Sequence, residues 1–304
     1  MNTDIVLDAL QRIFQIRKPK RKKYREAAEK DAAGLLVPRE ISFCRGCPHR
    51  ASFLAIKLAL DKDGREGFVA GDIGCYGLGA GATGFNQIKL LHCMGSGMGN
   101  ASGFSKMASY GFDQPVVAVA GDSTFFHACL PALVNAKFTD ADALFVVLDN
   151  SVTAMTGFQE NPASSFDHFG RTKTPILPEE LAGGLGVPVT VLDPVKNIHK
   201  ATDTVYDSLQ KKGVNVIVFR RACSIFEAKS QPKDQLQRKA KVTPEKCKGA
   251  ECNCGLFCSR IIGCPGIYFD KQKNKAYILE DSCNGCGLCV QLCPEKAISL
   301  YVKK

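Results

Sequence analysis

The sequence predicts an α/β protein, in which a parallel sheet flanked by helices on both faces is followed by a small cysteine-dense domain. Two observations lead to this prediction. Between about residues 41 and 228, continuous apolar runs alternate with helix-like segments, as is typical of strands that are buried on both faces of a parallel sheet. Residues 246–304 are rich in cysteine and too few to build a large apolar core of their own.

The elements of the main domain follow from local patterns. Runs such as PVVAVA and ALFVVL are apolar throughout, which indicates fully buried strands, and the segments between them have helical spacing. Strands are expected at Pro115–Ala120, Ala143–Leu148, Val187–Leu192 and Val214–Phe219, with Gly67–Ala70 leading into another, and helices at Ala51–Leu60, Leu130–Ala136 and about Ile198–Lys211.

Two polar segments border these domains. Residues 1–40 combine an amphipathic helix over 4–16 with a basic run from Arg17 to Arg25. No aromatic stacking pattern accompanies the basic run, so a solvated linker or a docking arm for an acidic partner is favoured over a nucleic-acid arm. Residues 229–245 carry two prolines and no apolar period, which predicts a linker.

Composition limits the class of protein. The 304 residues carry a formal net charge of +10, and 45% of them are hydrophobic and 23% charged, as in ordinary globular proteins. No apolar run approaches the ~20 residues that span a bilayer, and residues 1–20 lack a secretory signal pattern. The sequence therefore predicts a cytoplasmic protein without a membrane span, where clustered cysteines bind metal more often than they form disulfides.

One cysteine run has a specific meaning. Cys283, Cys286, Cys289 and Cys293 form C-x2-C-x2-C-x3-C before Pro294, the bacterial-ferredoxin signature for 4Fe–4S clusters. In this arrangement the fourth cysteine serves the neighbouring cluster. The first cluster therefore takes its fourth ligand from Cys264, which also precedes a proline.

Cys293 then belongs to a second cluster in the tail. Its other three ligands must come from an irregular group whose spacing does not repeat C-x2-C-x2-C. We predict Cys247, Cys254 and Cys258, with Cys252 as the alternative to Cys254. A zinc site is the competing interpretation of this stretch.

Two polar turns follow neighbouring apolar strands. Gly121-Asp122-Ser123 ends one strand and Asp149-Asn150-Ser151 ends the next, and Asn150 lies 28 positions after Asp122 (150 − 122). One strand–helix–strand unit fits this interval and brings both turns to the same sheet edge. There Asp122 and Asn150 can give oxygen ligands to Mg²⁺, and Gly121 lets the backbone approach phosphates. By themselves, such turns are also common as ordinary loops.

Six strings in order carry a family resemblance. They are FCRGCPHR from Phe43, GDIGCY from Gly71, CMGS from Cys93, GDSTFFH from Gly121, LDNS from Leu148 and TAMTG from Thr153. Over residues 41–304 the chain resembles the thiamine-diphosphate half of indolepyruvate:ferredoxin oxidoreductase alpha subunits, which belong to the 2-oxoacid:ferredoxin oxidoreductases. The resemblance implies the thiamine-diphosphate-binding fold and a ferredoxin-like tail.

The resemblance also implies the binding residues. Mg²⁺ would be held by Asp122, Asn150 and the main-chain carbonyl of Val152. Ser123 departs from the motif glycine of the thiamine-diphosphate family. Further cofactor contacts would come from Gly74, Gly121, Ser123 and Thr153.

Four scattered cysteines gain a role from the same resemblance. Related enzymes hold a 4Fe–4S cluster beside the thiamine, which brings the expected total to three clusters. By position its ligands would be Cys44, Cys47, Cys75 and Cys223. The alternative for Cys75 and Cys223 is that they are small buried side chains. Cys93 and Cys129 lack a cluster context and are expected to pack.

Three side chains are candidates for catalysis. His49 follows the CxxC-Pro turn and His127 follows the metal turn, so either can contact diphosphate or substrate, or assist proton transfer. A lone histidine is more often structural. Related pyruvate-type enzymes have asparagine at the position of Met155, and a methionine there suggests a pocket for a bulky or aromatic 2-oxoacid.

The implied activity is oxidative decarboxylation of a 2-oxoacid, with coenzyme A as acyl acceptor and ferredoxin, or another one-electron carrier, as electron acceptor. The family's alpha subunit is about twice as long, so a partner subunit of the pyrimidine-domain or gamma type is expected, in a hetero-oligomer. Two alternatives stay open: a non-oxidative thiamine-dependent decarboxylase, and an electron-transfer subunit that binds no thiamine.

Overall fold

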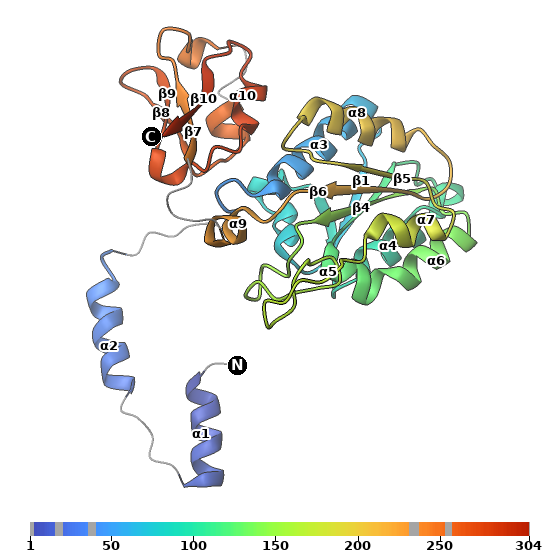
Figure 1. The fold of residues 1–304 in the computed structure, drawn as a ribbon, viewed down its shortest axis with the longest axis horizontal. Helices are drawn as coiled ribbons and strands as arrows, with labels where there is room; N and C mark the ends of the chain where they lie inside the picture. The colour runs from blue at the N-terminus through green and yellow to red at the C-terminus, as the bar shows by residue number, and fades with distance from the viewer. Residues whose placement is uncertain (1–2, 16–20, 36–40, 231–236, 253–256, 304) are drawn as a thin grey trace. The chain divides into compact units, whose positions relative to one another are not determined.

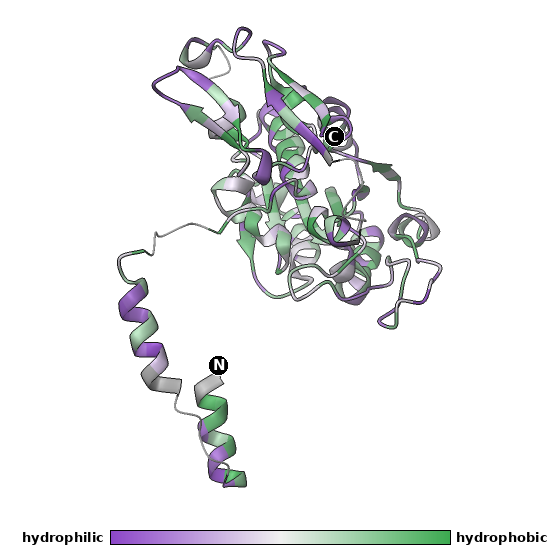
Figure 2. Cartoon of the chain, turned by 60° about the vertical axis from the view of Figure 1, so that its left-hand side comes forward, coloured by the Kyte–Doolittle hydropathy of each residue, from purple (hydrophilic) through white to green (hydrophobic). Residues whose placement is uncertain are grey.

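The computed structural model describes residues 3–15, 21–35, 41–230, 237–252 and 257–303. The chain divides into two compact units, residues 1–40 and 41–304. In the first unit α1 spans Thr3–Phe14, where the amphipathic helix is expected, and α2 spans Arg21–Ala32. Figure 2 shows apolar residues along α1 and a mostly hydrophilic α2. No helix among the described residues is long and apolar enough to cross a membrane.

The second unit is built on a parallel sheet (Figure 1). Within residues 41–230, which are described without a gap, six strands form it in the order β2-β1-β3-β4-β6-β5. The strands are β1 Phe68–Gly71, β2 Ile88–Leu91, β3 Val116–Gly121, β4 Ala143–Asp149, β5 Val189–Leu192 and β6 Asn215–Arg220. The α/β prediction is confirmed, because every neighbouring pair in this sheet is parallel.

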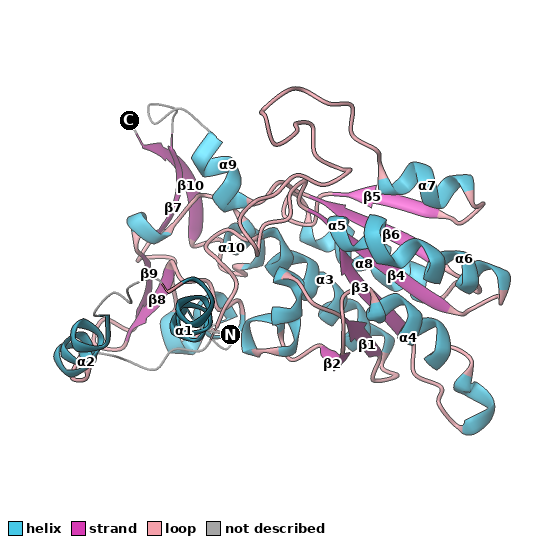
Figure 3. Ribbon diagram, turned by 90° about the horizontal axis from the view of Figure 1, so that it is seen from below, coloured by secondary structure: helices cyan, strands magenta, loops and turns pink. Residues whose placement is uncertain are grey.

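Helices cover both faces of the sheet (Figure 3). On one face α3 and α8 pack on alternate strand residues such as Val117, Val119 and Val146. On the other face α4, α6 and α7 pack on the intervening residues, including Ala118 and Phe145. These helices span Pro48–Asp63 (α3), Ser96–Phe104 (α4), Leu130–Phe138 (α6), Pro178–Gly184 (α7) and Ile198–Leu209 (α8). Because β3 and β4 are buried along their whole length, their sequences are apolar without alternation.

The tail contains two antiparallel strand pairs. Strand β7, Gln237–Val242, pairs with β10, Ile298–Lys303, and β8, Ile267–Asp270, pairs with β9, Lys275–Ile278. The short helix α10 covers Leu288–Leu292, and α9, Ser224–Ser230, precedes the tail.

The linker prediction for residues 229–245 is wrong where β7 lies. Ala240 and Val242 of this strand pack into the hydrophobic core, although the composition of the strand is polar. Lys239 is itself buried, because its ammonium group donates to the carbonyls of Glu280 (2.8 Å) and Cys283 (2.7 Å). Residues 231–236 lie outside the described part.

The described part of the tail shares its hydrophobic core with the main body. Ile262, Leu288 and Ile298 of the tail belong to the same hydrophobic cluster as Phe53 and Ile198 of the main body. Residues 41–304 form one compact unit, in which the predicted small C-terminal domain shares its core with the main body. In addition, the Gln291 side chain of α10 accepts a hydrogen bond from the backbone N–H of Ile198 (2.9 Å) and donates to the Val195 carbonyl (2.7 Å) at the start of α8.

Candidate functional site

The carboxyl ends of β3 and β4 bring the two polar turns together. The strands pair in register from Val116 with Ala143 to Gly121 with Leu148, so Asp122 and Asn150 leave adjacent strands at the same sheet edge. Both side chains are buried. This is the edge at which ligands bind in open α/β sheets.

Asp122 is shaped to accept a cation. Its Oδ1 accepts a hydrogen bond from the Ser123 N–H (2.7 Å), whereas its buried Oδ2 has no hydrogen-bond partner among the described residues. Burial, and next the charge of Asp149, raise the pKa of Asp122 to about 7. A buried carboxylate oxygen without a donor is costly unless a ligand compensates it, so the geometry fits Mg²⁺.

The Asn150 turn is held in a strained conformation. Asn150 Oδ1 accepts from the Val152 N–H (3.2 Å), and Ser151 between them has a φ of +63°. Asp149 Oδ1 accepts from the Ser151 N–H (3.0 Å), and Ser164 Oγ donates to the Ser151 carbonyl (2.7 Å). Left-handed backbone at a non-glycine residue costs about 1–3 kcal/mol and is concentrated at functional sites. Here it fixes the segment that contains two of the expected magnesium ligands.

The three catalytic candidates lie in different environments. His49 is buried, burial lowers its pKa to about 4, and its Nε2 lies 3.4 Å from Asn150 Nδ2. A neutral His49 therefore connects the CxxC turn to the metal motif. His127 lies in the π-helical turn Phe125–Cys129 with an exposed side chain, and Met155 is 53% exposed.

Packing explains why glycine occupies positions 74 and 121, and the sequence did not indicate this. A Cβ at either position would overlap the ring of Tyr76, so both glycines make room for this side chain. The Tyr76 hydroxyl bonds to the fully buried Asp72 and to Thr124 Oγ1 (2.9 Å). Close approach to phosphate is thus not needed to explain Gly121.

Thr153 begins a small hairpin beyond the metal motif. Its N–H donates to the Gln159 carbonyl (2.8 Å), and Thr153 pairs with Gln159 in an antiparallel bridge. Its backbone N–H is therefore already engaged within the loop.

Two of the scattered cysteine segments are fixed by backbone hydrogen bonds: the Cys223 N–H donates to the Asn150 carbonyl (3.2 Å), and the Cys47 N–H donates to the Cys44 carbonyl (3.2 Å). Burial raises the pKa of Cys47 to about 12, and the nearby thiols of Cys44 and Cys75 contribute. Burial likewise raises the pKa of Cys75 to about 11, with contributions from Cys223 and Cys44 and a smaller one from Asp122. These thiols are thus within electrostatic range of one another, and Cys75 is within range of Asp122. The turns are tied by Ser224 Oγ, which donates to the Arg45 carbonyl (2.8 Å).

The predicted ligands of the first tail cluster also converge. Burial raises the pKa of Cys289, and Cys286, Cys264 and Cys283 add to the effect. Backbone N–H groups of Gly266 and Gly285 donate to the sulfurs of Cys264 (3.5 Å) and Cys283 (3.4 Å). Amide donors to sulfur stabilise thiolate, the form that binds iron.

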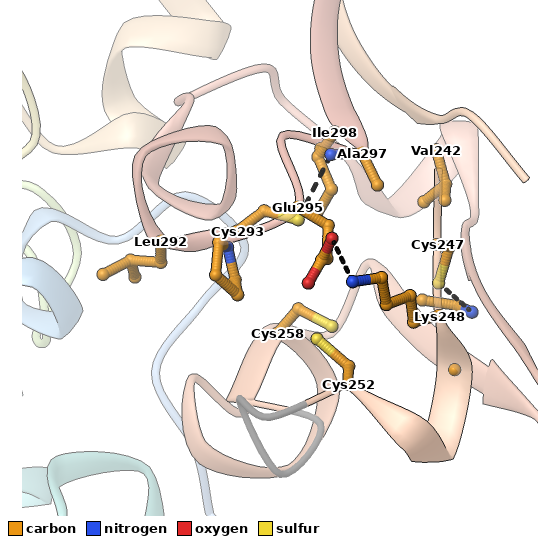
Figure 4. A pocket seen from close by; sticks show the side chains of 13 residues that line it. Val242, Cys247, Lys248, Cys252, Cys258, Leu292, Cys293, Glu295, Ala297 and Ile298 are labelled. Carbon is orange, nitrogen blue, oxygen red and sulfur yellow. Dashed lines mark hydrogen bonds and ion pairs between the residues drawn. The ribbon is translucent and has the colours of Figure 1, made fainter. Parts of the chain in front are cut away.

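A pocket in the tail gathers the remaining described cysteines (Figure 4). Cys247, Cys252, Cys258 and Cys293 line it, and the Ala297 N–H donates to Cys293 Sγ (3.3 Å). Figure 4 shows the side chains of Cys252 and Cys258 directed toward one another. The predicted ligand Cys254 lies outside the described residues, so the pocket contains the alternative, Cys252. Within the described part of the chain, no group of three or more His, Cys, Asp or Glu side chains is arranged for a single metal ion.

The two cysteines without a cluster context differ from each other. Cys129 is fully buried, as expected for a packing residue, and burial raises its pKa. Cys93 is exposed, so packing does not explain it.

Sequence reasoning missed several polar residues at this edge. Asn161 is 8% exposed, and it is among the groups that affect the pKa of Asp122. Its Oδ1 accepts from the Ala163 N–H (2.8 Å). Asp72 and Arg50 are likewise buried and polar. Asp72 and Arg50 lie inside the strings that carry the resemblance, which is the signal that could have found them.

Comparison with known proteins agrees with this geometry. Residues 72–219 match the family described as thiamine pyrophosphate enzyme, C-terminal TPP binding domain, and residues 276–299 match the 4Fe-4S binding domain. The main part of the chain is thus similar to the TPP-binding domain of thiamine pyrophosphate enzymes, and its tail is similar to a 4Fe–4S binding domain.

Its particular relatives are indolepyruvate oxidoreductase subunits. The chain is 38% identical over 289 residues to subunit IorA of Pyrococcus horikoshii and 34% identical over 273 residues to that of Archaeoglobus fulgidus. Each match covers 90% of this chain and 41% of the relative, so the chain spans about two fifths of the relatives' length.

A solved structure shares the fold. It is a 2-oxoglutarate:ferredoxin oxidoreductase from Magnetococcus marinus, with a TM-score of 0.51 and 16% identity, covering 66% of this chain and 74% of that chain.

Proposed function

We propose that the chain is the thiamine-binding and electron-transferring subunit of a 2-oxoacid:ferredoxin oxidoreductase. One observation carries the proposal: the buried Asp122–Asn150 edge, the cysteines around Cys47 and the described cysteines of the tail all belong to one compact unit. Cofactor chemistry and electron exit are thus served by adjacent parts of one fold.

The metal motif supplies binding and orientation. Asp122, Asn150 and the Val152 carbonyl would hold Mg²⁺, and Mg²⁺ would hold the diphosphate of thiamine. When bound, thiamine diphosphate supplies the electron sink for decarboxylation of a 2-oxoacid. The strained Ser151 turn keeps Asn150 and Val152 in position, and the neutral, buried His49 is placed to hold Asn150.

Two electrons released by oxidative decarboxylation would leave singly through three 4Fe–4S clusters. The ligands we propose are Cys44, Cys47, Cys75 and Cys223 for the proximal cluster, and Cys264, Cys283, Cys286 and Cys289 for the first tail cluster. For the second tail cluster the pocket supports Cys247, Cys252, Cys258 and Cys293. The predicted Cys254 remains a candidate in place of Cys252.

The substrate and partners complete the proposal. The relatives are indolepyruvate oxidoreductases by name, and the apolar, half-exposed Met155 suits a bulky or aromatic 2-oxoacid with coenzyme A as acyl acceptor. The proposal includes a partner subunit of the pyrimidine-domain or gamma type that completes the thiamine site. The chain's formal charge of +10 suits an acidic carrier such as ferredoxin.

The test is reconstitution of the full chain with iron and sulfide under anaerobic conditions. Three clusters correspond to about twelve iron atoms per chain. With Mg²⁺, thiamine diphosphate and the partner subunit, indolepyruvate should reduce a one-electron acceptor in a coenzyme A-dependent reaction.

The Asp122→Asn variant provides the matched comparison. It should keep its iron but lose Mg²⁺-dependent binding of thiamine diphosphate, measured by calorimetry, together with acceptor reduction. Acceptor reduction that survives this substitution would assign the chain to electron transfer without thiamine. Carbon dioxide release without acceptor reduction would assign it to non-oxidative decarboxylation.

A further inference from the structure

Arg50 is a buried cation that joins two cysteine turns. It lies in α3, and its side chain is 3% exposed. Nη2 donates to the Phe43 carbonyl (2.7 Å), next to Cys44, and Nη1 donates to the carbonyls of Ile262 (2.7 Å) and Gly263 (2.8 Å), next to Cys264. One guanidinium therefore bonds to the backbone immediately before a ligand of the proximal cluster and before a ligand of the first tail cluster.

The charge of Arg50 has no carboxylate partner. Among the described residues, no ion pair joins Arg50 to an Asp or Glu, and its hydrogen bonds all go to neutral carbonyls. Burial lowers the pKa of Arg50, and the charged groups that would act against this are four proposed cluster ligands, Cys264, Cys47, Cys286 and Cys44. A buried guanidinium is costly unless negative charge lies nearby, and thiolate-ligated clusters are the source of negative charge on both sides of this side chain.

The two turns are also in direct contact. A Cβ on Gly46, within the CxxC turn, would overlap the side chain of Asn284 in the Cys283–Cys286 turn. Arg45 of the same CxxC turn donates to the Asp281 carbonyl (2.5 Å). Arg45 is exposed, so water screens its charge, whereas the charge of Arg50 is not screened.

We propose that Arg50 is the electrostatic bridge between the proximal and the first tail cluster, positioning both turns and stabilising the extra negative charge that either cluster carries after reduction. The inference rests on the proposed function, because it needs the proximal cluster. It concerns how electrons cross from the main body to the tail. A cation close to both clusters lowers the free energy of the reduced form of each, because reduction adds negative charge.

The experiment is an anaerobic redox titration of the reconstituted full chain, followed by electron paramagnetic resonance, for Arg50→Gln, Arg50→Lys and Arg45→Gln. In Arg50→Gln the equilibrium constant for reduction should fall about tenfold or more at the proximal and the first tail cluster. The second tail cluster should not change and serves as an internal reference. Arg50→Lys keeps the charge, and Arg45→Gln removes a screened one, so both should stay within about threefold of the unmodified chain.

Unchanged potentials in an iron-replete Arg50→Gln chain would overturn the inference, as would an equal shift of all three clusters. If the glutamine variant does not retain iron, the Arg50→Lys variant tests the inference. A tenfold fall in the equilibrium constant for reduction, with the charge retained, would exclude the electrostatic role. Iron content of the unmodified chain tests the proposed function separately. About eight iron atoms in place of twelve would mean that one of the three proposed clusters is absent. If that is the proximal cluster, a bridge between two clusters is excluded, although the effect of Arg50 on the first tail cluster could still be measured.

Discussion

At the scale of single residues, glycine and buried polar groups determine how the cysteine turns fit together. Gly46 has a φ of +64° and borders Asn284, so it needs both the left-handed conformation and the missing side chain. Gly64, which ends α3 with a φ of +79°, needs only the conformation, because nothing lies within 4 Å of a Cβ placed there. The two glycines therefore separate backbone strain from close packing.

Gly46→Ala should destabilise the chain by about 3 kcal/mol, because overlap with Asn284 adds to the conformational cost. Gly64→Ala should cost about 1 kcal/mol from conformation alone. Chemical unfolding of both variants measures the difference. Combining Gly46→Ala with Asn284→Ala should restore the part of the unfolding free energy that is lost through the overlap. Equal losses in the two glycine variants would show that Gly46 and Asn284 are not in close contact.

The residues of the site differ in how far the sequence could predict them. Asp122 and Asn150 follow apolar strands directly, so local pattern and strand topology are sufficient to bring them to one edge. The partners of Arg50 could not be predicted in this way, since it bonds to carbonyls 212 and 213 positions away. Such contacts depend on how the tail packs, which no local period describes.

At the scale of elements, the sequence predicts the strands that are buried on both faces better than the strands that are only half buried. The strands β3, β4 and β6 are mainly apolar, whereas four of the six residues of β7 are polar or charged, which is typical of a linker. What stabilises β7 is the antiparallel ladder with β10 and the buried ammonium group of Lys239. Neither feature has a compositional signal.

Lys239→Met should lower the free energy of unfolding by about 2 kcal/mol, because the carbonyls of Glu280 and Cys283 lose their donor. Lys241→Met, at an exposed position of the same strand, is the control and should change stability by less than about 0.5 kcal/mol. Chemical unfolding measures both variants. Similar losses in the two would mean that the ammonium contacts of Lys239 contribute nothing.

Helix α7 is joined to β6 by an ion pair that gives a pH dependence. Arg220 donates to both carboxylate oxygens of Glu179 (2.8 and 2.6 Å) and to Asp149 (2.7 Å). The Arg220 hydrogen bonds lower the pKa of Glu179 below its ordinary 4.5. A carboxylate with a lowered pKa stabilises the folded state above its unfolded pKa, and this contribution is lost as the pH falls through the folded value.

Glu179→Gln should therefore cost about 1 kcal/mol at pH 7, and its difference from the unmodified chain should vanish as the pH falls below 4.5. Unfolding curves across this range measure the difference. The exposed neighbour Glu180, changed to glutamine, is the matched control. A Glu179→Gln loss that persisted at the acid end would attribute the effect to packing and not to charge.

At the scale of the whole molecule, the division between the two compact units falls after Glu40. The sequence predicted this border from a change of composition, and it predicted the sheet and the ferredoxin-like tail. It did not predict that the tail completes the core of the main body, because residues 229–245 have the composition of a linker. Shared burial of apolar side chains from distant segments is visible only once the chain is folded.

Removal of residues 1–40 should leave the folding of residues 41–304 intact. The melting temperature of the shortened chain should lie within about 2 °C of the full chain, because the second unit contains both described hydrophobic clusters. Calorimetry with matched iron content measures this. A fall of ten degrees would show that the first unit stabilises the second.

The hydrophobic cluster shared by the main body and the tail also limits how electrons can leave the proposed complex. Ile262, Leu288 and Ile298 would have to be exposed to water before the tail could leave the sheet domain, so the tail is not a tethered shuttle. In the proposed electron-transfer chain, the distances between clusters are therefore fixed by the fold. Its turnover would then depend on how often a carrier collides with the tail, and would respond to carrier concentration and ionic strength.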